Sequence, residues 1–158
     1  MKVLLLCLIS LTCTACALPV LKDFELTDQN LKSRVYHFPT KKVTVMTVSD
    51  HKGTEQLTPW IQSVYDRYQT RIEIDGIADV SMIPGTFHNF FRKAFRKKLT
   101  RSVLLDWKGD AVRQFGYKKG VANIYVIDRD GQILIHCSGP MTPTLLEELG
   151  GKVDEALR

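Results

Sequence analysis

The sequence predicts a mixed α/β domain in which parallel strands form the core of a sheet, a C-terminal antiparallel hairpin extends it, and helices cover both faces. In the first half, short β-rich segments are separated by stretches with helical periodicity. Such an alternation requires right-handed crossovers between parallel strands. In the second half, apolar segments 124–127 and 133–136 flank a tight turn that ends on Asp130-Gly131, a sequence typical of a hairpin.

The strands are expected where β-branched residues gather or where apolar and polar residues alternate. Residues 43–48, with the sequence VTVMTV, give the strongest signal and predict a central strand. The full set of expected strands is 24–27, 43–48, 71–74, 102–107, 124–127 and 133–136.

The helices are expected where apolar residues recur at three- and four-residue steps. Residues 54–68 show this pattern, and Pro59 either kinks that helix or lies at its first position. A second helix begins near Pro84, a short one covers 111–115, and the last covers 142–157. Thr142 and Pro143 supply the cap and the first position of this last helix. Gly150-Gly151 weakens it by about 1 kcal/mol per glycine.

Residues 1–17 predict a secretory signal peptide, followed by one domain over residues 18–158. A short positive start precedes an apolar run that ends at Leu11, and small residues follow. The run is too short to cross about 30 Å of hydrocarbon. No transmembrane segment is therefore expected in the mature chain.

Two cleavage sites compete in this segment. Cleavage after Ala17 would release a soluble chain that begins at Leu18, whereas cleavage after Ala15 would leave Cys16 available for lipidation. Cys13 stands three residues before Cys16, where a lipoprotein signal normally has leucine, and this favours the soluble form. The protein is expected to be periplasmic or secreted in the first case, and membrane-anchored through a lipid on Cys16 in the second.

Composition excludes several functional classes. Of four cysteines, only Cys137 falls within the expected domain, so a disulfide framework is excluded. The histidines show no spacing typical of a metal site, and no glycine-rich phosphate loop or nucleophile elbow is present. Neither a metal nor a cofactor is therefore expected. The net charge of +5 is compatible with nucleic-acid binding, but the export signal argues against a nucleic-acid partner.

Three segments resemble the redoxin branch of the thioredoxin-like superfamily. Phe24-Glu25-Leu26-Thr27-Asp28 is similar to the opening of that family. Residues 102–106, followed by Gly109 and Phe115-Gly116, resemble its strand-D-x-x-G segment, and residues 125–133 resemble its hairpin. Residues 66–70 (DRYQT) and 83–85 (IPG) are similar to a small group of bacterial periplasmic proteins of this fold that lack the redox cysteines. The resemblance implies a thioredoxin-like fold.

The sequence departs from that family at the positions that carry its chemistry. The redoxin enzymes place one or two cysteines after the first central strand, where a helix N-terminus lowers a thiol pKa. This chain has no cysteine between Ser49 and Glu55. The enzymes also carry a cis-proline that faces those cysteines, and Ala122 stands at its position here. We therefore expect an exported non-catalytic binding module of the cell envelope, with an unidentified protein or peptide partner.

Two candidate sites remain: the loop at the position of the missing cysteines, and Cys137 on the second hairpin strand. The helix N-terminus beside Ser49, Asp50, His51 and Thr54 could bind an anion or a carboxylate, or these residues could simply form a polar capping loop. Alternatively, the protein could be a single-cysteine oxidoreductase or peroxidase-like enzyme that uses Cys137. Adjacent strand residues point to opposite faces of a sheet, so His136 is poorly placed to activate this thiol, which is expected to pack as a small apolar side chain.

A third candidate is a basic surface on the helix that begins near Pro84. No acidic residue occurs between positions 84 and 105. The cations of this surface are Arg92, Lys93, Arg96, Lys97, Lys98 and Arg101. One interpretation is an amphipathic surface for an anionic membrane or an acidic partner. The other, favoured because the flanking strands need apolar cover, is a domain helix whose aromatic face, Phe87, Phe90, Phe91 and Phe95, packs into the core.

Overall fold

The computed structural model describes residues 18–158. The expected signal peptide and Cys16 lie outside the described residues. Within them, no helix is both long enough and apolar enough to cross a membrane.

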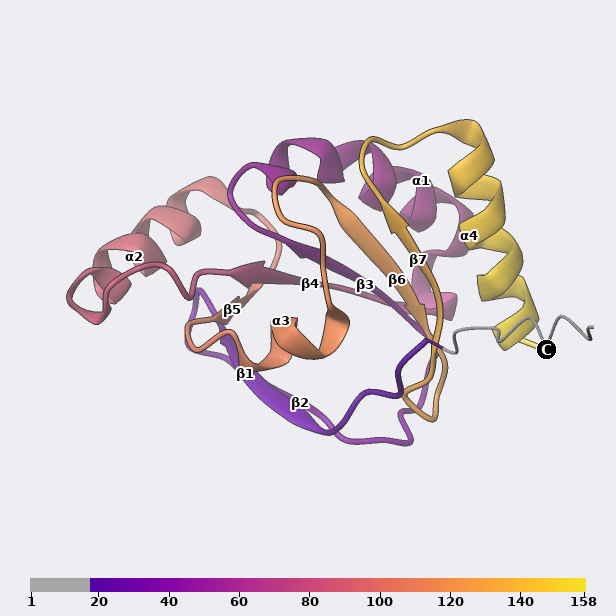
Figure 1. The fold of residues 1–158 in the computed structure, drawn as a ribbon, viewed down its shortest axis with the longest axis horizontal. Helices are drawn as coiled ribbons and strands as arrows, with labels where there is room; N and C mark the ends of the chain where they lie inside the picture. Colours follow the sequence, from indigo (N-terminus) through magenta and orange to yellow (C-terminus); the bar gives the residue numbers. More distant parts are fainter. Residues whose placement is uncertain (1–17) are drawn as a thin grey trace, which may run out of the picture.

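In the part of the chain that the structure describes, seven strands form one mixed sheet in the order β2-β1-β5-β4-β3-β6-β7 (Figure 1). Neighbours β5, β4 and β3 are parallel, and the remaining pairs are antiparallel. The predicted parallel core and C-terminal antiparallel hairpin are thus confirmed. The strands are β1 (Phe24–Asp28), β2 (Ser33–Tyr36), β3 (Thr44–Ser49), β4 (Glu73–Asp79), β5 (Leu104–Asp106), β6 (Asn123–Ile127) and β7 (Ile133–Ser138).

Within residues 18–158, four α-helices and three short 3-10 helices lie between or after these strands. They are η1 (Gly53–Gln56), α1 (Leu57–Tyr68), η2 (Gln69–Arg71), η3 (Gly85–Phe87), α2 (His88–Lys98), α3 (Asp110–Phe115) and α4 (Pro143–Ala156). Pro59 falls in the first turn of α1, where its missing N–H has no helical partner to lose. Thr142 caps α4 as predicted, because its hydroxyl accepts the N–H of Leu145 at 3.2 Å.

Side chains of the central strand alternate between two apolar clusters, one on each face of the sheet. Val43 and Val45 belong to the cluster covered by α1 and α4, and Met46 and Val48 belong to the cluster covered by α3. Trp60 of α1 is fully buried in the first cluster, where its indole N–H donates to the Gly139 carbonyl at 3.0 Å. This bond fixes the start of α1 against the loop that leads into α4.

Side chains of the DRYQT segment (residues 66–70) hold α1 against α4. The Arg67 guanidinium contacts Glu147 at 3.3 Å and Asp154 at 2.9 Å, and the Tyr68 hydroxyl donates to the Gly150 carbonyl at 2.9 Å. A Cβ atom on Gly150 would lie 2.6 Å from the Arg67 guanidinium. A glycine in mid-helix, costly in isolation, thus leaves room for the Arg67 side chain against α4.

The structure differs from the sequence prediction at two strands. β2 was not predicted, because it is a short edge strand whose first three residues are exposed and two of them polar. β4 continues well past residue 74, although Asp75-Gly76 suggests a turn. Gly76 pairs with Thr47 of β3, and a Cβ there would lie 2.9 Å from the Thr47 hydroxyl oxygen. The glycine thus makes room for a neighbouring side chain within the sheet.

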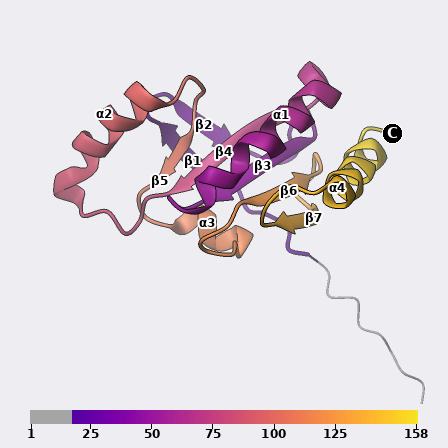
Figure 2. The ribbon, with the colours of Figure 1, turned by 90° about the horizontal axis from the view of Figure 1, so that it is seen from above.

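The expectation that the aromatic face of α2 packs into the core is wrong. No residue of α2 is buried, and Phe87 and Phe90 are 53% and 68% exposed. Figures 1 and 2 both show α2 at one end of the molecule, away from α4.

Candidate functional site

The loop after β3 forms a closed set of hydrogen bonds around Asp50. One carboxylate oxygen of Asp50 accepts the N–H of Gly53 at 2.9 Å, and its backbone carbonyl accepts both the N–H and the hydroxyl of Thr54. The hydroxyls of Ser49 and Thr54 lie 3.1 Å apart, within hydrogen-bond distance. His51 is exposed at the outer side of the loop. The four predicted residues are therefore adjacent, but three of them bond mainly to the loop itself.

This loop also closes onto the segment that precedes β6. The second carboxylate oxygen of Asp50 accepts the N–H of Gly120 at 2.8 Å. The side-chain oxygen of Gln56 accepts the N–H of Ala122 at 3.1 Å. A Cβ atom added to Gly53 would lie only 2.2 Å from the Val121 carbonyl oxygen. The loop after β3 and the segment before β6 are thus in direct backbone contact.

This contact uses the polar groups that a ligand would need. The Ala122 N–H is bonded to Gln56, and the Ala122 carbonyl accepts the N–H of Gly139 at 2.8 Å. The carboxylate of Asp50 already occupies the place an anion would take at the Gly53 N–H. The arrangement fits the capping-loop interpretation of the sequence better than the anion-site interpretation. Gln56 and Gly120 could not be identified from sequence, because each bonds a residue more than 60 positions away.

Two further carboxylates lie at the ends of parallel strands, and both have structural roles. Asp79 at the end of β4 accepts bonds from Ser81 and from the Tyr117 hydroxyl. Burial alone would raise the pKa of Asp79, but these hydrogen bonds outweigh it and lower the pKa. Asp106 at the end of β5 is buried and accepts the N–H groups of Gly109 and Val112 at the start of α3. In residues 18–158, no group of three or more His, Cys, Asp or Glu side chains could hold a metal ion.

Cys137 lies inside the protein, away from this loop. It is 3% exposed, belongs to the cluster beneath α1 and α4, and directs its sulfur toward the Leu145 carbonyl at 3.9 Å. Burial, with a smaller contribution from Glu148, raises the pKa of the Cys137 thiol to about 11. The neighbouring His136 stacks on Tyr125 at 4.3 Å and bonds the Asn123 side chain instead. The prediction that Cys137 packs as an apolar side chain agrees with its burial.

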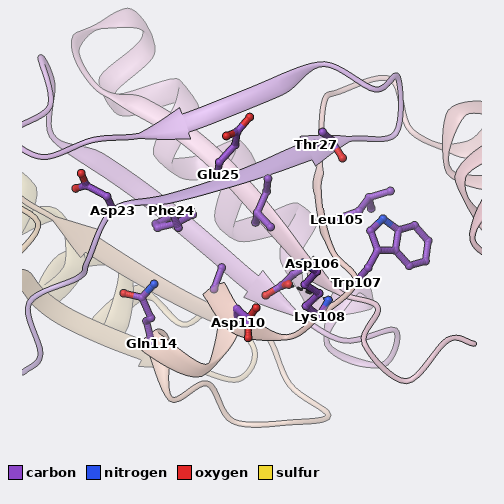
Figure 3. A pocket seen from close by; sticks show the side chains of 12 residues that line it. Asp23, Phe24, Glu25, Thr27, Leu105, Asp106, Trp107, Lys108, Asp110 and Gln114 are labelled. Atoms are coloured by element: carbon purple, nitrogen blue, oxygen red, sulfur yellow. Dashed lines mark hydrogen bonds between the residues drawn. The ribbon is translucent and has the colours of Figure 1, made fainter. Parts of the chain in front are cut away.

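An open cleft lies between β1 and α3, away from the loop after β3. Figure 3 shows Asp23 and Glu25 on one side of this cleft and Lys108, Asp110 and Gln114 on the other. The cleft has a volume of about 520 Å³. Its carboxylates already have partners: Asp23 bonds His37, Glu25 bonds Ser33, and Asp110 pairs with Arg113. The cleft therefore presents no constellation of free groups typical of catalysis.

The six predicted cations do not share one role. Three of them hold α2 and the following segment to the body: Arg92 lies over the Trp107 ring, Arg96 donates to the Gln29 carbonyl at 2.7 Å, and Arg101 lies over the Tyr65 ring. The other three, Lys93, Lys97 and Lys98, are exposed. Among residues 18–158, none of the six is ion-paired with an acidic side chain.

Comparison with known proteins defines the fold class. No family model matches the chain, and no curated protein matches its sequence. Solved structures match over most of its length, each below 25% identity. An exposed lipoprotein thioredoxin, Etrx1, from Streptococcus pneumoniae matches with a TM-score of 0.67 and 14% identity, covering 85% of this chain and 99% of its own.

Two further structures agree. A thioredoxin-family thiol:disulfide interchange protein from Chlorobium tepidum matches with a TM-score of 0.60 and 16% identity, covering 88% of this chain and 96% of its own. The peroxidoxin BcpB from Mycobacterium tuberculosis matches with a TM-score of 0.56 and 19% identity, covering 90% and 96%. The protein therefore has a thioredoxin-like fold, as the resemblance implied. The solved structures to which it is similar include a thioredoxin, a thiol:disulfide interchange protein and a peroxidoxin.

Proposed function

We propose that this protein is an exported, non-catalytic thioredoxin-fold binding module of the cell envelope. One observation carries the proposal: the loop at the family's active-site position contains no cysteine and is closed against the segment before β6. Asp50 and Gln56 hold that closure through bonds to Gly120 and Ala122, and Gly53 permits it by lacking a Cβ atom. A thiol exchange reaction needs an accessible thiolate, and this loop supplies no thiol.

Burial of Cys137 supports the same conclusion. A single-cysteine enzyme would need this thiol exposed and its pKa near the ambient pH. The thiol is instead packed against α4 with its pKa raised to about 11. The contacts of the described residues thus offer nothing in favour of the single-cysteine alternative.

Export is supported by the apolar N-terminal segment and by the similarity to a protein described as an exposed lipoprotein. The mature chain begins at Leu18 and is soluble, or it carries a lipid on Cys16. The intact mass of the mature protein distinguishes the two, because lipidation adds the mass of the acyl groups to a chain that begins at Cys16.

Activity assays test the non-catalytic role. The chain from residue 18 is assayed for reduction of insulin disulfides and for peroxide consumption with a thiol donor, beside a thioredoxin with an intact Cys-x-x-Cys motif. We expect the wild-type chain and the Cys137→Ser variant both to remain at background. Turnover that Cys137→Ser abolishes would overturn the proposal and establish the single-cysteine enzyme.

A further inference from the structure

Helix α2 is attached to the body by one of its faces. His88 stacks on the Trp107 ring at 3.9 Å, and Arg92 lies 5.5 Å from the same ring. One turn later, Arg96 donates to the Gln29 carbonyl, and Phe95 lines a small cavity shared with α1 and β4. Because these contacts recur at three- and four-residue steps, they define one inner face of the helix. The orientation of α2 is therefore fixed.

The opposite face of α2 combines lysines with large apolar side chains. Phe87, Phe90, Lys93 and Lys97 follow one another at steps of three and four residues, so they form one outward stripe. Phe90 is 68% exposed, and Met82, in the loop that leads to η3, is 83% exposed. The apolar side chains thus lie toward the N-terminal end of the helix, and the lysines toward its C-terminal end.

We propose that this outward face of α2 docks on an anionic lipid bilayer. Met82, Phe87 and Phe90 would enter the boundary between headgroups and acyl chains, and Lys93, Lys97 and Lys98 would contact lipid phosphates. This proposal rests on the proposed function and extends it. A protein exported to the cell envelope is next to a membrane surface, and the outward face of α2 is the part that would bind it.

Charge and shape favour a bilayer over an acidic protein. Between residues 84 and 105 the chain carries six cations and no acidic residue. The stripe lies on a helix at one end of the molecule (Figure 2). None of its four residues lines the cleft between β1 and α3 or the small cavity beside Phe95. At 11 residues, α2 is about 16 Å long, which suits a helix lying in the interface rather than crossing it.

The expected contributions follow from the two kinds of side chain. Each lysine near an anionic surface strengthens binding roughly fivefold at low salt. Loss of all three would therefore weaken binding up to about a hundredfold, and less at about 0.15 M salt, where the Debye length is about 8 Å. The aromatic contribution is hydrophobic and should persist as salt rises.

Cosedimentation with vesicles tests the proposal, using the chain from residue 18 so that the apolar N-terminal segment does not contribute. Vesicles of phosphatidylcholine alone are compared with an equimolar mixture of phosphatidylcholine and phosphatidylglycerol. The test variant is Lys93→Gln/Lys97→Gln/Lys98→Gln. Its matched control, Lys22→Gln/Lys41→Gln/Lys118→Gln, removes the same charge from exposed lysines elsewhere. A third variant, Phe87→Ser/Phe90→Ser, removes the apolar contribution, and circular dichroism checks that each remains folded.

We expect binding to anionic vesicles only, at least tenfold weaker in the α2 lysine variant and within about twofold of wild type in its control. The phenylalanine variant should also bind more weakly, including at high salt. Equal binding by both lysine variants would overturn the proposal, because it would show a general effect of charge. Absence of vesicle binding by the wild type would also overturn it and favour an acidic protein partner. Neither result depends on the insulin and peroxide assays, so failure of the membrane proposal and of the non-catalytic role are distinguishable.

Discussion

The reactivity of Cys137 is the prediction most directly worked from the structure. In the chain from residue 18 it is the sole cysteine, so a thiol reagent reports on it alone. Burial raises the pKa of the thiol from 9.0 to about 11. At pH 8 that shift lowers the thiolate fraction from about 9% to about 0.1%, and only the thiolate reacts. The native thiol should therefore react about a hundredfold more slowly than a free one, before any steric effect of packing against α4.

A chromogenic aromatic disulfide supplies the assay. Its second-order rate with the native chain at pH 8 is compared with the rate for the same chain in denaturant, which serves as the internal reference. We expect a ratio of about one hundred or more. A native rate within about tenfold of the denatured rate would refute both the burial and the raised pKa, and would return Cys137 to the list of candidate nucleophiles.

Two substitutions test, in turn, the closed loop after β3 and the hydrogen bond that Asp79 accepts from Tyr117. Gly53→Ala should destabilise the fold by roughly 1–3 kcal/mol in urea denaturation, because its Cβ must displace the Val121 carbonyl; an unchanged midpoint would contradict the close approach. Tyr117→Phe should cost about 1 kcal/mol at pH 7 by removing a hydrogen bond from ionised Asp79. Because the folded pKa of Asp79 is lowered, its stabilisation is present above pH 3.8 and lost as pH falls through the folded pKa. The difference between Tyr117→Phe and wild type should therefore shrink at pH 3, and a constant difference would contradict this role for Asp79.

Much of the fold could be predicted because its signals are local. The β-branched run of β3, the Asp-Gly turn of the hairpin and the Thr142 cap each depend on a few adjacent residues. β2 was missed because an exposed, polar edge strand has no apolar pattern. The end of β4 was missed because Gly76 looks like a turn residue until Thr47 of the neighbouring strand is placed against it.

The error at α2 arises because helical spacing shows which residues share a face but not what covers that face. Phe91 and Phe95 do lie on an apolar side of the helix, whereas Arg92, Lys93, Arg96 and Lys97 gather on the other side. The phenylalanines were assigned to the core from their spacing alone. Which cations anchor the helix depends on Gln29, Tyr65 and Trp107, which are distant in sequence or outside the helix.

The candidate site was predictable only in part. The lack of a cysteine after β3 is visible in the sequence, as is Ala122 where the redoxin enzymes that the sequence resembles carry a cis-proline. Closure of the loop is not visible, because it joins Asp50 to Gly120 and Gln56 to Ala122, more than 60 positions away along the chain. The decisive feature is thus a long-range contact between two short polar segments.

Amide hydrogen exchange measured by NMR tests that closure most directly. The N–H groups of Gly120 and Ala122 donate to Asp50 and Gln56, so both should exchange at least about a hundredfold more slowly than in an unfolded chain. In Asp50→Ala, protection at Gly120 should disappear while that of Tyr125 in β6 is retained. Exchange of Gly120 and Ala122 in the wild type at nearly the unfolded rate would show an open groove and contradict the account.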